Sequence, residues 1–241
     1  MILNVYILIL SFFLLGGIFM FFIARRKDQA ESRKLWIWYS VYFIIINILF
    51  ACTVFDPSLF HYLSVLIIFA GYLELIKLFT YSGFSFKGFF VISIFIYSIL
   101  AGCFYFFGLL RMELILYTFL IVSVFDAFSR IAGQLFNNRS LLPEISPGKT
   151  FEGITCGALC ALTASVFLRD LPGTSLSVAI LYTAGIIASA FTGDLAASWY
   201  RRRYKAREFS KTLPGLGGIL DCFCSLIAAG TFMYLLIRFH L

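Results

Sequence analysis

Two aspartates, Asp194 and Asp221, bracket a strongly basic stretch near the end of this 241-residue chain. On a helix that carries Asp194, the residues four, seven or eight, and eleven positions later share its face. These residues are Ser198, Arg201 or Arg202, and Lys205. The face is acidic at one end and basic along the rest. Two carboxylates beside arginines suit a divalent cation and the phosphates whose charge it neutralises.

A glycine-rich turn at 214–218 separates the basic stretch from Asp221. Proline and glycine end the preceding helix there, and an apolar run follows. Because glycine has no Cβ, we expect the backbone at Gly217 and Gly218 to approach a phosphate closely. Asp221 lies at the start of the apolar run. A carboxylate at the end of a membrane span is costly unless it is paired or binds a metal.

A second polar segment, Ser-Pro-Gly-Lys-Thr-Phe-Glu-Gly, occupies 146–153. It predicts a helix start, with Ser146 as the N-cap and Pro147 at the first helical position. Lys149 would then lie in the first turn, where the helix dipole and the ammonium group hold phosphate together. A capped helix with a surface lysine is the alternative. The segment lacks the glycine spacing of a P-loop, which disfavours a Walker-type NTPase.

Two further acidic residues lie in or beside apolar runs. Asp126 ends one run, and Arg130 follows one turn later on the same face, so the pair is either an interfacial ion pair or part of the site. Glu74 and Lys77 are three residues apart, which predicts an intrahelical pair, with a substrate role as the alternative.

The composition places these residues in a membrane protein. The chain is 61% hydrophobic and only 13% charged, and its mean hydropathy is +0.96. Continuous apolar runs of about 20 residues predict helices and exclude a β-barrel. We expect an all-α bundle of about eight transmembrane helices in a single membrane domain, with N-terminal helices in 1–125 and a catalytic region in 126–241. The expected spans are 2–24, 35–55, 62–81, 88–107, 113–125, 153–168, 176–192 and 219–237.

The positive residues predict the orientation of the bundle. If the loops after the odd-numbered spans face the cytosol, all of the 19 Lys and Arg residues lie there except Arg111, Arg169 and Arg238. Both termini are then outside, and Asp126, Lys149, Asp194 and Asp221 lie at the cytosolic face of a cell (inner) membrane. The net charge of +7 predicts anionic partners, meaning lipid headgroups or nucleotides before nucleic acid.

These segments together resemble the integral-membrane phosphatidate cytidylyltransferases, also called CDP-diacylglycerol synthases. The resemblance covers about 126–225 and rests on the 146–153 segment, Asp194, and the ungapped stretch from Ser198 to Asp221. In that stretch Ser198 matches the family's serine, and Gly217 and Gly218 match its glycine turn. Arg201 and Arg202 match its basic pair, and Arg207 with Glu208 stands at its Lys-Asp pair.

Four positions depart from the family's signature. Leu216 stands at its histidine, Cys222 at its arginine, Cys224 at its last aspartate, and Glu208 at another aspartate. We expect the missing carboxylate at 224 either to lower the affinity for Mg²⁺ or to change the substrate. Cys224 would be a weak ligand at most, since thiolate suits this cation poorly.

The resemblance implies transfer of CMP from CTP to phosphatidic acid, with Mg²⁺ as cofactor and a homodimer as the assembly. It implies Asp194 and Asp221 as metal ligands, and Asp126 is a candidate third. Lys149 and three arginines, Arg201, Arg202 and Arg207, would hold phosphates. Ser146, Thr150 and Ser198 complete the expected substrate-binding residues, with Gly217 and Gly218. The alternatives are a CTP-dependent transferase or kinase acting on another lipid, and a silent family member that only binds lipid or partners.

Overall fold

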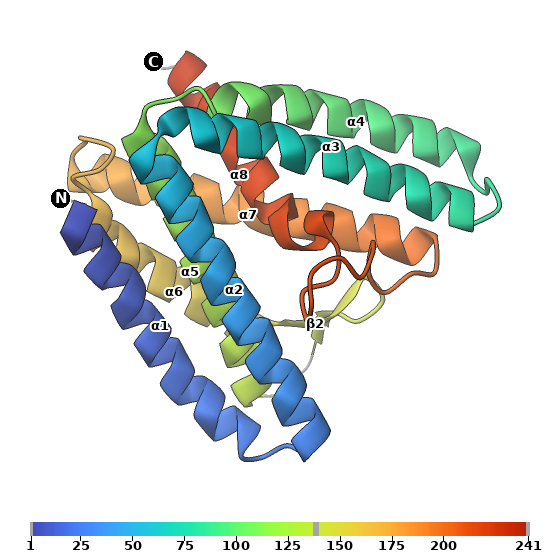
Figure 1. The fold of residues 1–241 in the computed structure, drawn as a ribbon, viewed down its shortest axis with the longest axis horizontal. Helices are drawn as coiled ribbons and strands as arrows, with labels where there is room; N and C mark the ends of the chain where they lie inside the picture. Colours follow the sequence, from blue (N-terminus) through green and yellow to red (C-terminus); the bar gives the residue numbers. More distant parts are fainter. Residues whose placement is uncertain (1, 137–139, 240–241) are drawn as a thin grey trace.

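The computed structural model describes residues 2–136 and 140–239, which form eight long helices and one two-stranded ribbon (Figure 1). The helices are α1 (Ile2–Ala24), α2 (Gln29–Phe55), α3 (Pro57–Tyr81), α4 (Lys87–Phe107), α5 (Met112–Phe136), α6 (Phe151–Leu168), α7 (Leu176–Arg203) and α8 (Ile219–Phe239). Between α5 and α6, β1 (Ser140–Leu142) pairs antiparallel with β2 (Ser146–Thr150).

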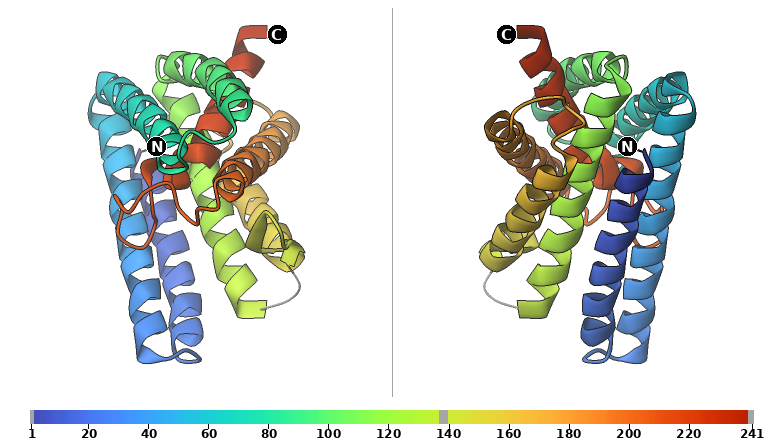
Figure 2. Two further views of the ribbon diagram at one scale, coloured as in Figure 1. Left: turned by 90° about the vertical axis from the view of Figure 1, so that its right-hand side faces the viewer. Right: turned by 90° about the vertical axis from the view of Figure 1, so that its left-hand side faces the viewer.

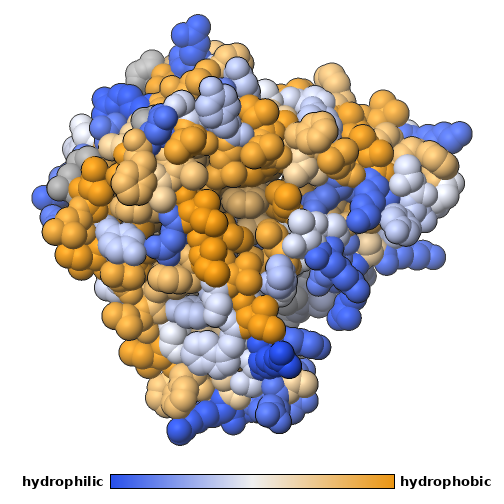
Figure 3. All heavy atoms as spheres, viewed as in Figure 1, coloured by the Kyte–Doolittle hydropathy of each residue, from blue (hydrophilic) through white to orange (hydrophobic). Residues whose placement is uncertain are grey.

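All eight helices of the described residues are long and apolar enough to cross a membrane, which confirms the all-α membrane fold. Large apolar side chains point outward from them, for example Leu14, Phe95 and Leu181, each more than 60% exposed. Figure 3 shows this broad apolar surface. In lipid an apolar exterior is the stable one, because backbone polar groups are already paired within each helix.

Helix α5 is the central element of the bundle, and it contacts α1, α2, α6, α7 and α8. The hydroxyl of its buried Tyr117 hydrogen-bonds to Ser165 of α6 and Thr183 of α7, and donates to the carbonyl of Ala179. At Gly153 of α6, a Cβ would lie 2.6 Å from the Ser129 carbonyl oxygen of α5. The two backbones therefore touch, and α6 with the strand before it is held against α5.

The segment before α6 differs from the prediction. Ser146 is not the N-cap, because it lies in β2 opposite Leu142. Thr150 caps α6 instead, and its hydroxyl accepts the N–H of Gly153 at 3.1 Å. Threonine is also a favoured cap residue, and the β-ladder occupies the residues before it. Lys149 consequently lies in a strand, ahead of the helix.

Helices α5 and α7 extend furthest beyond the spans that the hydropathy predicted. Helix α5 continues to Phe136, so Asp126 lies inside it and not at its end. Helix α7 is continuous to Arg203, which keeps Asp194, Ser198 and Arg201 on one helix. Lys205 was wrongly expected on the same face: it follows the helix with a φ of 54°, in the left-handed region.

Helices α1 and α2 run side by side and extend beyond the others (Figures 1 and 2). Both labelled chain ends lie toward the upper left of Figure 1, whereas the connections after α1, α3 and α7 lie toward its lower and right-hand sides. An even number of spans accounts for this arrangement, because each pair of helices returns the chain to its starting side.

Candidate active site

A polar cavity of about 410 Å³ lies where α2, α5, β2, α6, α7 and α8 meet. Eight of the residues predicted from the sequence line it: Asp126, Ser146, Lys149, Thr150, Asp194, Ser198, Arg201 and Asp221. The structure thus brings together side chains from four separate elements of the chain, α5, β2, α7 and α8. Arg202, Arg207, Gly217 and Gly218 were also predicted, and they are not among the lining residues.

Lys149 and Asp194 form the first ion pair of the cavity. The Lys149 Nζ lies 2.5 Å from Asp194 Oδ2, and the two side chains are 18% and 25% exposed. The ammonium also lies 4.7 Å from the centre of the Phe191 ring. Strand β2 supplies the cation and α7 supplies the carboxylate. Both groups keep some exposure to the cavity, so each can reach a ligand there.

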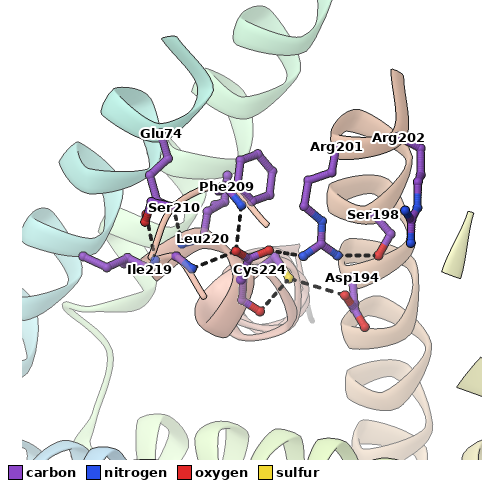
Figure 4. A network of polar contacts seen from close by, with 12 residues as sticks. Glu74, Asp194, Ser198, Arg201, Arg202, Phe209, Ser210, Ile219, Leu220 and Cys224 are labelled. Atoms are coloured by element: carbon purple, nitrogen blue, oxygen red, sulfur yellow. Dashed lines mark hydrogen bonds and ion pairs between the residues drawn. The ribbon is translucent and has the colours of Figure 1, made fainter. Parts of the chain in front are cut away.

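Arg201 and Asp221 form the second pair, which has more partners (Figure 4). Arg201 donates from Nη1 to Asp221 Oδ1 and from Nη2 to Ser198 Oγ at 2.7 Å. The other oxygen of Asp221 accepts the backbone N–H groups of Phe209 and Gly218, at 2.8 and 2.7 Å. Both carboxylate oxygens therefore already have donors, and the side chain is only 3% exposed.

Glu74 caps α8 and does not pair with Lys77, so the predicted intrahelical pair is wrong. Its carboxylate accepts the N–H groups of Ile219 and Leu220 at 2.9 and 2.7 Å, and the hydroxyl of Ser210 at 2.6 Å (Figure 4). Glu74 is 5% exposed. A buried carboxylate is more stable beside the N-terminal amides and dipole of a helix than beside one flexible lysine.

The glycine turn makes room for these two carboxylates. A Cβ on Gly217 would lie 2.7 Å from Asp221 Oδ2, and a Cβ on Gly218 would lie 2.6 Å from Glu74 Oε1. Gly217 also has a φ of 95°, a backbone conformation that residues with a side chain rarely adopt. In the structure the close approach predicted for this turn is an approach to protein carboxylates.

Two predicted arginines lie away from the cavity. Arg202 is exposed and donates from Nε to the Ile145 carbonyl at 3.2 Å, so it ties α7 to the segment before β2. Arg207 lines a separate hollow together with Lys77 and Lys211. Helical spacing separates Arg201 from Arg202, since consecutive residues lie about 100° apart around the axis.

Helix α2 contributes cavity residues that the sequence analysis did not identify. Trp38 and Tyr42 line the cavity, and the Arg130 guanidinium lies 4.4 Å from the centre of the Trp38 ring. Tyr42 donates to the Ser123 carbonyl at 3.0 Å, which joins α2 to α5. The described ion pairs do not include Asp126 with Arg130. Aromatic residues in an apolar run occur both in cavity walls and on lipid-facing surfaces, so the sequence did not distinguish these two positions.

The carboxylates fit a cation only with a ligand's help. Among the described residues, no three His, Cys, Asp or Glu side chains come together as a metal-binding group. Asp126 of α5 and Asp194 of α7 both line this cavity. Mg²⁺ is commonly held by one or two carboxylates together with substrate phosphates and water, which is the arrangement that this pair permits.

Comparison with known proteins points to one family for the cavity segments from α5 onward. The profile of the cytidylyltransferase family matches residues 106–240, which is more than half of the chain. No solved structure matches this chain.

Several curated relatives bear the name phosphatidate cytidylyltransferase. One, from Staphylococcus haemolyticus, is 38% identical over 113 residues, which are 46% of this chain and 44% of the relative. A Haemophilus influenzae relative is 34% identical over 125 residues, covering 49% of this chain and 43% of the relative. The match thus spans less than half the length of these relatives. Strand β2, α7 and the start of α8, which carry both ion pairs, all lie within the matched residues 106–240, and the chain belongs to the cytidylyltransferase family.

Proposed function

We propose that this protein transfers CMP from CTP to phosphatidic acid and releases pyrophosphate, forming CDP-diacylglycerol for phospholipid biosynthesis. The observation that carries the proposal is the polar cavity, in which Lys149–Asp194 and Arg201–Asp221 lie together between membrane helices. A lipid phosphate and a nucleotide triphosphate repel each other, so a site for both requires fixed positive charge at the membrane.

The reaction needs little chemistry from the protein beyond positioning and charge. A phosphate oxygen of phosphatidic acid attacks the α-phosphorus of CTP, a new P–O bond forms, and the bond to the β-phosphate oxygen breaks as pyrophosphate leaves. Lys149 and Arg201 offset the charge of the phosphates. The attacking phosphate is ionised near neutral pH, so a general base is not required.

We further propose Mg²⁺ as the cofactor, held by Asp194 and Asp126 together with substrate phosphates. When bound, the cation would offset the charge on the triphosphate. Asp221, with donors at both oxygens, serves better as the group that holds Arg201 toward the cavity. Lys149 is the partner of Asp194 and would turn to a phosphate as the cation binds.

The cavity is proposed to face the cytosol of a bacterial cell membrane, where CTP is found. The bias of Lys and Arg toward the loops after the odd-numbered helices supports this orientation. A homodimer remains the proposed assembly, on the resemblance to the family alone.

The test is to incubate the purified protein with radiolabelled CTP, Mg²⁺ and a panel of lipid phosphates. Labelled CDP-diacylglycerol formed from phosphatidic acid, with release of pyrophosphate, is the expected result. Product formed only with another lipid phosphate would favour a different acceptor. Leu216 and Cys222, which depart from the family's signature, both lie in the cavity wall and would be the first residues to explain such a change. Phosphorylated lipid would indicate a kinase. No product with any acceptor would indicate a silent family member.

A further inference from the structure

A second, basic groove lies beside the loop that joins α7 and α8. It has a volume of about 730 Å³, and its lining includes Lys77 of α3 and the loop residues Arg207 and Lys211. Glu208 is the only carboxylate among the lining residues. None of these residues lines the polar cavity. The groove is therefore a positively charged hollow that the proposed reaction does not use.

The surroundings of the groove are typical of the membrane interface, where lipid headgroups lie. It lies at the end of α3, a predicted membrane span, and Tyr81 in its wall is 83% exposed. Just beyond it, Phe84 and Phe86 are 56% and 50% exposed. Exposed aromatic residues at the end of a span are typical of the membrane interface. Lysine and arginine at the same level attract anionic headgroups.

The groove is connected to the polar cavity through two adjacent residues. Ser210 lines the groove and donates its hydroxyl to Glu74, which caps α8. Phe209 lines the groove as well, and its backbone N–H donates to Asp221. These two residues lie between Arg207 and Lys211, the two basic residues of the loop. A ligand that holds these two basic side chains in place would therefore also restrain the Phe209 N–H and the Ser210 hydroxyl, which donate to Asp221 and Glu74.

We propose that this groove binds the phosphate-bearing headgroup of an anionic phospholipid of the surrounding leaflet. The bound headgroup holds the 207–211 loop in the position from which the Phe209 N–H donates to Asp221. The ligand is a bulk anionic lipid, distinct from the phosphatidic acid that enters the polar cavity. The proposal that the groove binds lipid does not depend on the reaction. The proposed effect of that lipid on turnover rests on the proposed function.

Direct lipid binding tests the proposal without any turnover. The full chain is reconstituted in phosphatidylcholine vesicles, and its selectivity for spin-labelled phosphatidylglycerol over spin-labelled phosphatidylcholine is measured by electron paramagnetic resonance. We expect Lys77→Gln with Lys211→Gln to lower that selectivity by about fivefold for each lysine removed, and added salt to lower it in the wild type. The matched control is Arg33→Gln with Lys34→Gln, two exposed residues at the start of α2 that lie outside the groove.

The outcomes separate the possible occupants. Equal losses in the groove variant and the control would overturn the proposal, because general surface charge would then explain the selectivity. A loss for spin-labelled phosphatidic acid without a loss for phosphatidylglycerol would also overturn it, since the groove would then be the substrate site. In phosphatidylcholine vesicles that contain increasing amounts of phosphatidylglycerol, turnover of the wild type should rise with the phosphatidylglycerol content and turnover of the groove variant should not. A wild type that binds selectively but has no turnover would contradict the proposed function and leave the groove assigned.

Discussion

The two ion pairs of the cavity differ in how firmly they are held. Asp221 accepts from one guanidinium and two backbone amides and is 3% exposed, whereas Asp194 is 25% exposed and has Lys149 as its ion-pair partner among the described residues. Cys224 adds only a weak contact to Asp194, at 3.9 Å. The difference assigns separate tasks within one site. Asp221 organises the protein, and Asp194 is available to exchange its partner when a ligand binds.

Replacing Asp194 should have the largest effect on activity. Asp194→Asn keeps the shape of the side chain and removes its charge, so we expect turnover to fall by about 10²- to 10³-fold, as for the loss of one preorganised electrostatic group. The thermal unfolding midpoint should change little, because the residue has few partners. The measurement is CDP-diacylglycerol formation beside a melting curve in detergent. Asp170→Asn is the control, since Asp170 is 85% exposed and its ion-pair partner among the described residues is the half-exposed Arg169.

Replacing Asp221 should instead destabilise the protein. Asp221→Asn leaves Arg201 in the cavity without its counter-charge, and we expect a cost of about 3 kcal/mol, as for the broken partner of a buried ion pair. The unfolding midpoint should fall, and activity should fall with it. An unchanged midpoint combined with lost activity would contradict the division of tasks, because Asp221 would then act chemically.

Replacing Glu74 should destabilise the same region by a smaller amount. In Glu74→Gln, one carboxylate oxygen becomes an amide NH₂ that faces a backbone N–H of α8, which leaves a buried donor without an acceptor and costs about 2 kcal/mol. The midpoint of denaturation should therefore fall by less than in Asp221→Asn. Glu113→Gln is the matched control, since Glu113 pairs with the exposed Arg111 at 3.4 Å. Equal midpoints for the two variants would refute the capping role.

Local spacing explains which parts of the site could be predicted. Asp194, Ser198 and Arg201 follow helical periodicity, and the glycine turn ends one helix and begins the next, so their common location was expected. Glu74 was misassigned because local rules offer only Lys77, whereas its actual partner amides are 145 and 146 residues away. Lys149 was placed in a helix because the pairing of β2 with β1 has no equally strong local signal. Trp38 and Tyr42 depend entirely on how α2 packs against α5.

Replacing Arg202 should have the smallest effect on stability and turnover, and the comparison with its neighbour Arg201 tests which of the two arginines belongs to the site. It is exposed and its Nε donates to the Ile145 carbonyl, whereas Arg201 lies in the cavity with Asp221 and Ser198. We expect Arg202→Gln to change stability by less than about 0.5 kcal/mol and turnover by less than about threefold. Arg201→Gln should lower both far more, because it removes the counter-charge of Asp221. A strongly raised KM for CTP in Arg202→Gln, with an unchanged melting curve, would contradict this expectation. Arg202 would then contact the nucleotide from outside the cavity and would belong to the substrate site together with Arg201.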